Sequence, residues 1–390
     1  MKREQWIEAV LSRLREDQLQ RWLEAYPGCG GRIRDSNRTL LNFCSNDYLD
    51  LCRHPEVVQA SAKALLEFGA GAAASRLLTG TLPPHEQLER RLAHFKGYPA
   101  SLVFGSGYLA NAGIISSLVG RGDVIFADRL SHASILDAAA LSRARLVRFR
   151  HNDPGHLEDL LRRGGRTGRT LVVTESVFSM DGDLAPLPDL ADVALRYGAM
   201  MMVDEAHATG VFGPAGSGLV RKHGLEGKVN VSMGTLSKAL GGYGGFAACS
   251  TAVRELLVHR ARAFIYTAAP PPSVIGSSLG ALDVLAHSPD LGSELLGRAH
   301  RFRERLRASG LDVMGSQSQI IPVKVGDNAR SLSLARRLRA QDVLAAAIRP
   351  PTVPAGTARL RLSLTLAHSE EDLARAASVI IASARAEGLA

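Results

Sequence analysis

One lysine of this chain stands in a frame that suits covalent catalysis. Lys238 lies within residues 235–245, between two hydroxyl residues and a cluster of glycines, and the chain has only seven lysines against forty arginines. Upstream, an apolar run ends in Asp204, and His207 follows three residues later. Pyridoxal phosphate (PLP) chemistry needs an amine to hold the aldehyde, a carboxylate to protonate the ring nitrogen, and hydroxyl and N–H groups to grip the phosphate. The pattern therefore predicts a PLP site.

A glycine-rich turn offers a place for the phosphate. Residues 105–111 follow an expected strand and open an expected helix, so the N–H groups near Gly107 and Tyr108 can face a dianion. Such a turn by itself is more often merely structural, and Asp204 by itself also reads as a cap or loop aspartate. The presence of Lys238 favours a functional role for both the turn and Asp204.

Two further features suit the same chemistry. His132 stands at the start of an expected helix, where its ring can lie on a cofactor, although a histidine there is more often ordinary. His207 can donate to the cofactor's ring hydroxyl or remain a loop histidine. Arg359 and Arg361 alternate along an expected strand, so both point to one side, and one of them can hold a carboxylate through two hydrogen bonds.

Length and composition are those of a globular enzyme. With 390 residues we expect more than one domain: an N-terminal helical arm (1–45), a large domain (46–285) and a small domain (286–390). No signal peptide or membrane segment is evident, so a cytoplasmic protein is expected. The four cysteines form no CxxC pair, so we expect reduced thiols and no metal. The net charge of +9 is carried mostly by arginines along helices, which favours a solvated surface over nucleic-acid binding.

Alternating apolar runs and amphipathic stretches indicate an α/β fold with a mainly parallel sheet. Strands are expected at 102–104, 124–127, 146–149, 171–174, 200–203, 229–233 and 246–249, with helices at 85–95, 109–118, 157–163 and 187–197. The apolar spacing of residues 4–24 predicts a first helix. The C-terminal part of the chain is predicted to form a smaller α+β domain. Its expected elements are helix 295–308, strand 320–325, helix 329–339, strand 360–364 and helix 370–384.

Together these segments resemble the α-oxoamine synthases, PLP enzymes of the aspartate-aminotransferase fold (fold type I). The resemblance runs from about residue 20 to the end of the chain, and the segments that carry it are 42–49, 128–134, 175–183, 203–210, 235–245 and 347–361. One departure is residues 71–76, where relatives tend to be richer in glycine and serine. The resemblance implies a homodimer with active sites at the subunit interface.

The family's site residues carry over to matching positions here. The resemblance implies that Lys238 holds PLP, Asp204 pairs with the ring nitrogen, His132 stacks on the ring and His207 contacts the ring oxygen. It places further cofactor contacts at Gly107, Tyr108, Ser179 and Thr235. Substrate contacts are implied at Arg21, Asn46, His132, Thr352 and Arg361, with Asn46 and Arg361 orienting the amino-acid carboxylate.

The segment 349–361 is typical of members that condense L-alanine with a pimeloyl thioester, on CoA or on acyl carrier protein, with loss of carbon dioxide in biotin biosynthesis. The alternative within the chemistry joins glycine or serine to another acyl-CoA, as glycine C-acetyltransferase and serine palmitoyltransferase do. From a different class, a non-catalytic basic nucleic-acid-binding or scaffold protein would also account for the charge. The basic surface itself suggests recruitment of an acidic acyl carrier.

Overall fold

The chain divides into two compact units in the computed structural model, which describes residues 3–164 and 168–389. The larger unit comprises Asn46–Ser179 and Asp183–Leu296. The smaller unit comprises the described residues up to Ser45, the segment Met180–Gly182, and the chain from Gly297 onward. The division into an arm, a large and a small domain at residues 45 and 285 stays a prediction.

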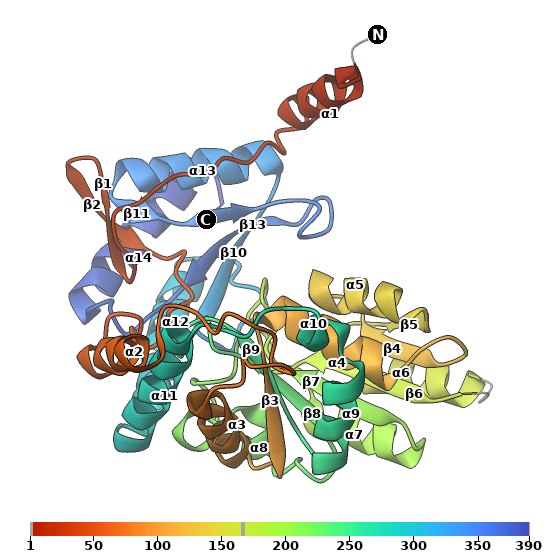
Figure 1. The fold of residues 1–390 in the computed structure, drawn as a ribbon. Helices are drawn as coiled ribbons and strands as arrows, with labels where there is room; N and C mark the ends of the chain where they lie inside the picture. The colour runs from red at the N-terminus through yellow and green to blue at the C-terminus, as the bar shows by residue number, and fades with distance from the viewer. Residues whose placement is uncertain (1–2, 165–167, 390) are drawn as a thin grey trace. The chain divides into compact units, whose positions relative to one another are not determined.

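A seven-stranded sheet forms the centre of the larger unit (Figure 1). Its order is β3-β9-β8-β7-β6-β4-β5. β9 runs antiparallel to both of its neighbours, and the other neighbouring pairs are parallel, so the expected mainly parallel sheet is confirmed. The strands are β3 (Ala100–Phe104), β4 (Val124–Asp128), β5 (Arg145–Phe149), β6 (Thr170–Glu175), β7 (Met200–Asp204), β8 (Val231–Thr235) and β9 (Gly245–Cys249).

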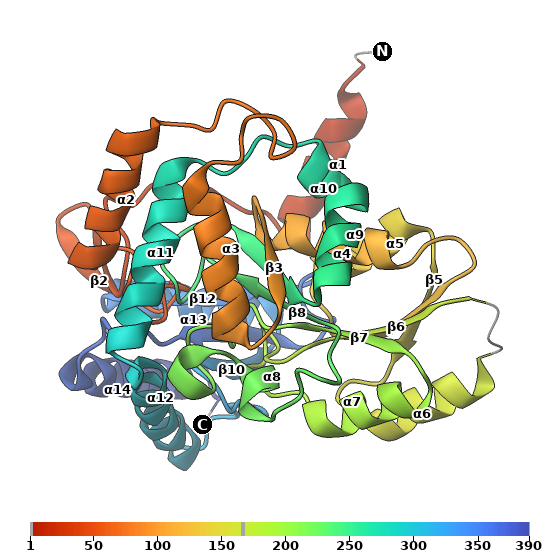
Figure 2. The ribbon, with the colours of Figure 1, turned by 60° about the horizontal axis from the view of Figure 1, so that its bottom comes forward.

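Helices cover both faces of this sheet (Figure 2). α4, α5, α9 and α10 lie over one face, while α6 and α7 pack together on the other. The helices of the larger unit are α2 (Pro55–Phe68), α3 (Pro83–Lys96), α4 (Gly107–Leu118), α5 (Ala133–Ser142), α6 (Pro154–Arg163), α7 (Leu187–Arg196), α8 (Leu219–Lys222), α9 (Thr251–Arg260), α10 (Arg262–Ile265) and α11 (Pro272–His287). A short 3₁₀ turn spans Pro214–Gly216, and α12 (Leu291–Ala308) begins in this unit and ends in the other.

The central strands are apolar because both of their faces are covered. β6 and β7 are buried from their second residue onward, and their side chains pack with α4 and α5 into one core that includes Ile114, Ile135 and Val173. β5 differs, since it lies at the sheet edge and most of its residues are exposed or half-buried. Polar residues at the carboxyl ends of the central strands are thus held by a rigid core.

The smaller unit has two three-stranded sheets, with the orders β1-β2-β11 and β10-β13-β12. Phe43 stacks on His368 and on Phe302 between its elements. The elements are α1 (Gln5–Glu16), β1 (Arg32–Asp35), β2 (Arg38–Asn42), β10 (Ile320–Gly326), α13 (Asn328–Ala340), β11 (Val343–Leu344), β12 (Ala346–Ile348), β13 (Ala358–Ser363) and α14 (Glu370–Ala386).

The first helix is shorter than its apolar spacing predicts. The expected helix 4–24 is wrong beyond Glu16, because Gln18 adopts a φ of 56° and the N–H groups of Leu19 and Gln20 both turn back to the carbonyl of Leu14. No residue of α1 is buried, so the burial that would stabilise a longer helix is missing among the described residues.

The strand expected at 229–233 is displaced by two residues. Val229 donates its N–H to Leu225 in a turn, so β8 starts at Val231 and ends at Thr235. This shift brings the hydroxyl of Thr235 to the strand end. Within the part of the chain that the structure describes, no helix has the length and apolar character needed to cross a membrane.

Candidate active site

The amine of Lys238 lies against the imidazole of His207. Lys238 lies in the loop after β8, and His207 lies in the loop after β7. Lys238 Nζ is 2.8 Å from His207 Nε2, and His207 Nδ1 is 2.7 Å from the hydroxyl of the buried Tyr48. That hydroxyl also lies 3.2 Å from Oδ1 of Asn46. The structure therefore brings together three predicted site residues, with Tyr48 as a link that the sequence did not single out.

Asp204 ends β7 with both carboxylate oxygens occupied. Its side chain is 5% exposed. Oδ1 accepts the backbone N–H of Ala206 at 2.9 Å, and Oδ2 accepts the Asn111 amide at 2.8 Å. Hydrogen bonds of this kind stabilise the charged form of a carboxylate. Asp204 can thus present a fixed negative charge to a cationic ring nitrogen.

A hydrogen-bonded relay joins Asp204 to His132. The Asn111 amide also donates to the Ser134 hydroxyl at 2.9 Å, and that hydroxyl lies 2.8 Å from Nδ1 of His132. The backbone N–H of Ser134 points at the same ring nitrogen at 3.2 Å, which makes Nδ1 an acceptor and leaves the proton of a neutral ring on Nε2. Asn111 stood within the glycine-rich segment 105–111, but sequence reasoning gave it no role. The only signal was its position on the first turns of α4.

His132 starts α5 at the carboxyl edge of the sheet, and its surroundings favour the neutral ring. Partial burial lowers the pKa of His132, with Asp204 opposing and Lys238 adding to this effect. Its backbone N–H donates to Glu175 at 2.6 Å. Burial first, and then the negative charge of Asp204, raise the pKa of Glu175 well above its usual value. The raised pKa favours the neutral form of Glu175, so Asp204 does not have a second negative charge beside it.

The turn before α4 has glycines that allow neighbouring backbone and side-chain groups to come close to it. Ser106 caps the helix by accepting from Leu109, and the N–H groups of Gly107 and Tyr108 precede the first helical bond. A Cβ at Gly107 would stand 3.2 Å from Met233 and 3.7 Å from Thr235, and one at Gly245 would stand 2.7 Å from the Ser106 carbonyl oxygen. Because these positions are glycines, the N-terminus of α4, the Thr235 hydroxyl and the backbone at Gly245 can lie close together. Their hydrogen-bond donors suit the binding of a phosphate group.

Two other predicted cofactor contacts, Ser179 and Tyr108, belong to the larger unit. Ser179 follows β6 and is 9% exposed. Tyr108 is 47% exposed, and its hydroxyl donates to Asp137 at 2.6 Å. Taken together, the donors around Gly107, the carboxylate of Asp204 and the amine of Lys238 fit the phosphate, ring nitrogen and aldehyde of PLP.

A buried ion pair supports the loop that carries Asp204 and His207. Lys96 donates to Glu205, and both side chains are almost completely buried. Glu205 also accepts the Ser232 hydroxyl at 2.8 Å and the Val220 N–H at 3.0 Å. These bonds tie the end of β7 to β8 and α8, so the loop has little freedom to move.

The predicted substrate residues Arg21, Thr352 and Arg361 belong to the smaller unit. Arg21 donates to the Thr352 hydroxyl at 3.4 Å, and both are exposed. Arg361 is 7% exposed, and its guanidinium donates to Ser363 at 2.7 Å. Arg359 is committed elsewhere, because its guanidinium pairs with Asp181 and donates to the Thr357 carbonyl. Arg361 therefore remains the better candidate for a carboxylate.

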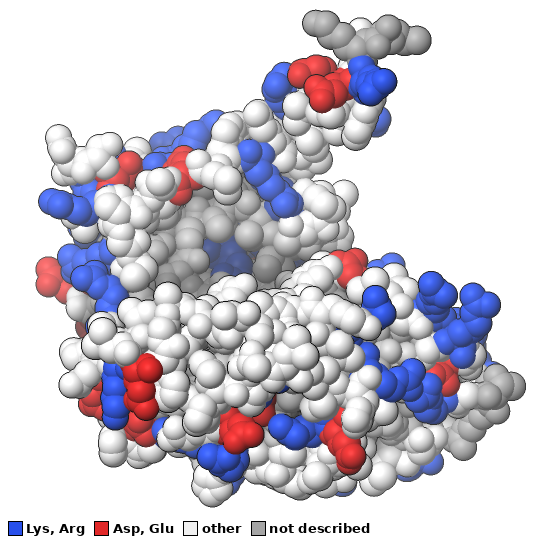
Figure 3. All heavy atoms as spheres, in the orientation of Figure 1, with Lys and Arg blue, Asp and Glu red and all other residues white. Residues whose placement is uncertain are grey.

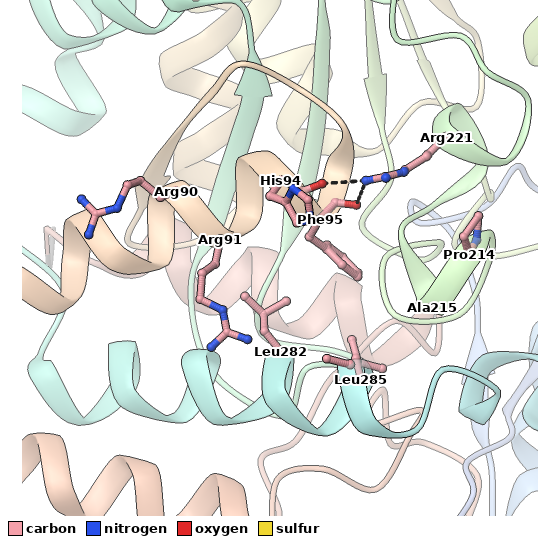
Figure 4. A pocket seen from close by; sticks show the side chains of 10 residues that line it. Arg90, Arg91, His94, Phe95, Pro214, Ala215, Arg221, Leu282 and Leu285 are labelled. Atoms are coloured by element: carbon pink, nitrogen blue, oxygen red, sulfur yellow. Dashed lines mark hydrogen bonds between the residues drawn. The ribbon is translucent and has the colours of Figure 1, made fainter.

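The pocket shown in Figure 4 contains none of these residues. It measures about 460 Å³ and lies between α3, α8 and α11 of the larger unit. Arg221 at its edge donates to the carbonyls of His94 and Phe95, so it caps α3 instead of facing a ligand (Figure 4). Among the described residues, no group of three or more His, Cys, Asp or Glu is arranged to hold a metal ion.

Comparison with known proteins matches this geometry. The model of the aminotransferase class I and II family fits residues 38–380. A protein of Geobacter sulfurreducens named 8-amino-7-oxononanoate synthase is 48% identical over 378 residues, 96% of each chain. One of the same name from Anaeromyxobacter dehalogenans is 50% identical over 364 residues, 93% of this chain and 91% of its own.

Solved structures of PLP enzymes have folds similar to that of this chain. A serine palmitoyltransferase of Sphingomonas wittichii is 35% identical with a TM-score of 0.93, covering 100% of this chain and 99% of its own. An 8-amino-7-oxononanoate synthase of Francisella tularensis is 29% identical with a TM-score of 0.77, covering 90% of this chain and 99% of its own. The chain belongs to the aminotransferase class I and II family, with the PLP fold type I. Within this family, its sequence is similar to proteins named 8-amino-7-oxononanoate synthase.

Proposed function

We infer that this chain is a PLP-dependent acyltransferase that condenses L-alanine with a pimeloyl thioester. The reaction releases carbon dioxide and yields 8-amino-7-oxononanoate for biotin biosynthesis. The observation that carries this is the placement of Lys238 beside His207, on loops that follow adjacent strands, with Asp204 at the end of β7. Relatives at 43–50% identity over at least 90% of the chain bear the name of this activity.

The cofactor contacts that we propose lie in the larger unit. When bound, PLP supplies an electron sink for negative charge at the amino-acid Cα. Lys238 would hold the aldehyde and, once displaced by alanine, take the Cα proton on its amine. Asp204 would keep the ring nitrogen protonated, and His132 would present its flat neutral ring. Gly107, Tyr108, Ser179 and Thr235 would surround the phosphate.

Substrate recognition involves a different set of residues. Asn46 and Arg361 would orient the alanine carboxylate, since a guanidinium can bind both oxygens at once. Thr352 and Arg21, which are hydrogen-bonded to each other, would contact the acyl donor. His207 would donate to the ring oxygen of the cofactor.

A serine palmitoyltransferase-like activity is the second candidate. Its support is the higher TM-score of that solved chain, 0.93 against 0.77. Fold similarity alone does not select an amino acid, because one fold hosts many substrates. The sequence similarity, which reaches 48% identity over 96% of the chain, weighs toward alanine.

The deciding experiment supplies purified protein and PLP with alanine, glycine or serine, each with pimeloyl-CoA, palmitoyl-CoA or acetyl-CoA. Mass spectrometry of the products should find 8-amino-7-oxononanoate with alanine and pimeloyl-CoA at the highest rate. A preference for serine with palmitoyl-CoA would overturn the assignment. A protein without a visible PLP absorption band would point instead to the non-catalytic alternative.

A homodimer in the cytoplasm completes the proposal. The larger unit exposes Leu66 (86%) on α2, Leu78 (77%) before α3 and Tyr266 (71%) after α10. A contiguous patch of exposed apolar side chains marks a protein interface, so these residues are the ones to test. Light scattering should give twice the 41.6 kDa chain mass, and Leu66→Asp with Leu78→Asp should shift the protein toward monomer.

A further inference from the structure

The hydroxyl group of Tyr48 lies close to two side chains of the candidate active site. Its oxygen is 2.7 Å from Nδ1 of His207 and 3.2 Å from Oδ1 of Asn46. On the face drawn in Figure 3 charged side chains stand at the surface, whereas Tyr48 is completely buried in the larger unit. A tyrosine hydroxyl has a single proton and an amide oxygen can only accept, so Tyr48 can donate to only one of these two neighbours.

The distances favour His207 as the acceptor. Hydrogen bonds that an O–H group donates are commonly about 2.7–2.8 Å long and seldom exceed about 3.0 Å, whereas those from an N–H group are commonly about 2.9–3.0 Å. The contact with His207 has the length of a bond from a hydroxyl, and the contact with Asn46 is longer than such bonds usually are. The hydroxyl proton of Tyr48 therefore points to Nδ1 of His207.

This hydrogen bond determines which ring nitrogen of His207 carries the proton. A neutral imidazole has one N–H donor and one acceptor nitrogen. When Nδ1 accepts from Tyr48, the ring proton lies on Nε2, the nitrogen that is 2.8 Å from Nζ of Lys238. An N–H group at this place can donate to the ring oxygen of the cofactor, whereas the other tautomer would present an acceptor there.

The backbone holds both partners of this hydrogen bond in place. The carboxylate of Asp47, next to Tyr48, accepts two N–H groups of its own turn at 3.0 and 3.2 Å. On the other side, Gly210 has a φ of 85°, and a Cβ there would stand 2.5 Å from the Cβ of Ala239. The loop of His207 thus packs directly on the segment that carries the lysine, which leaves the imidazole little room to turn.

We propose that Tyr48 is a positioning residue that fixes the tautomer of His207 and so keeps an N–H donor directed at the cofactor, an inference that rests on the proposed function. Tyr48 acts through the imidazole and takes no part in the chemistry itself. A buried tyrosine hydroxyl usually finds a partner in any protein, so a purely structural role is the alternative. The two roles differ in what the loss of the hydroxyl changes.

The first test measures the tautomer directly. Full-length protein with ¹⁵N-labelled histidines, with and without PLP, gives two-bond ¹H–¹⁵N correlations that report which ring nitrogen is protonated, and His207→Gln identifies the His207 signal. We expect the proton on Nε2 in the wild type and a population with the proton on Nδ1 in Tyr48→Phe. A wild type protonated on Nδ1, or an unchanged tautomer in Tyr48→Phe, would overturn the proposal.

Tyr98→Phe is the matched control for Tyr48→Phe. Tyr98 is also buried, and its hydroxyl donates at 2.9 Å to the carbonyl of Val229, before β8 begins, whereas Lys238 follows the other end of that strand. Both variants lose one buried hydroxyl, so both should unfold at a lower temperature. Only Tyr48→Phe should change the absorption band of bound PLP and lower kcat about 10-fold, with the KM for alanine within about twofold. The same changes in Tyr98→Phe would leave only a structural role for Tyr48.

A double-mutant cycle tests whether Tyr48 acts through His207. In a His207→Gln background, the further change Tyr48→Phe should alter kcat less than about twofold. A loss of about 10-fold in both backgrounds would show that Tyr48 acts independently, which contradicts the proposal. A wild type that has the proton on Nε2 and binds PLP but makes no product from alanine and pimeloyl-CoA would support the tautomer and contradict the proposed function.

Discussion

The two units hold their functional residues in contrasting ways. In the larger unit, Asp204 and His207 are each 5% exposed, and several hydrogen bonds below 3 Å fix them. In the smaller unit, Arg21 and Thr352 are exposed and meet through one contact of 3.4 Å. Groups that move protons and hold charge need fixed geometry, whereas groups that admit a long substrate can adjust. Changes in the larger unit should therefore lower kcat, and changes in the smaller unit should mainly raise KM.

Lys238→Ala should give the largest loss. Turnover should fall at least ~10⁴-fold, because the covalent hold on the aldehyde and the proton transfer vanish together. Borohydride reduction and peptide mapping of the wild type should find the cofactor label on Lys238. Lys324→Ala, an exposed lysine of the smaller unit, is the matched control and should keep full activity. Label on another lysine would move the catalytic centre elsewhere.

Asp204→Asn should lower kcat by about 10²–10³-fold, which corresponds to the loss of a charged partner for the ring nitrogen. The KM for alanine should change little, since Asp204 does not face the substrate carboxylate in the proposal. Asp189→Asn on the exposed side of α7 is the control. Near-normal turnover in Asp204→Asn would mean that another group protonates the ring.

Arg361→Lys tests the smaller unit. The variant keeps the positive charge but loses the two-pronged geometry, so the KM for alanine should rise about 10–100-fold with a smaller effect on kcat. A steady-state titration with alanine at saturating acyl donor separates the two constants. If kcat falls and KM stays, the contrast between the units fails at this residue.

Asn111→Ala should produce an intermediate effect. The change removes donors to both Asp204 and Ser134, so kcat should fall about 5–30-fold as His132 and Asp204 lose their alignment. The absorption band of bound PLP should also change, since Asp204 faces the ring nitrogen in the proposal. A merely structural role would lower the unfolding temperature and leave that band in place.

The smallest effect concerns the stability of the larger unit. Burial opposes a charged His151, but its hydrogen bonds to Asp128 and Asp183 outweigh burial and raise its pKa to about 9. A raised histidine pKa stabilises the fold fully below about pH 6.5, and this stability is lost as the pH rises through about 9. His151→Gln should therefore be less stable than the wild type by about 2 kcal/mol at pH 6, with the gap closing near pH 10. Denaturant unfolding at both pH values measures it, and a gap independent of pH would exclude the charge as its source.

Much of the larger unit was predictable because its signals are local. The apolar runs that form β4, β6 and β7 appear in the sequence as short buried strands, each followed by a polar residue at its carboxyl end. The smaller unit was less predictable. β11 and β12 have two and three residues, which is too short for a periodic pattern, and α1 lacks the packing that its apolar spacing implied.

Residue types and spacing were enough to assign Lys238, Asp204 and the glycine-rich turn at Gly107 to one kind of chemistry. Strand ends and helix starts are set by neighbouring residues, so these positions are visible in one dimension. The contacts between the side chains, in contrast, depend on the folded chain. Tyr48 reaches His207 across 159 positions and Asn111 reaches Asp204 across 93, and such pairs form only when folding brings these distant segments side by side.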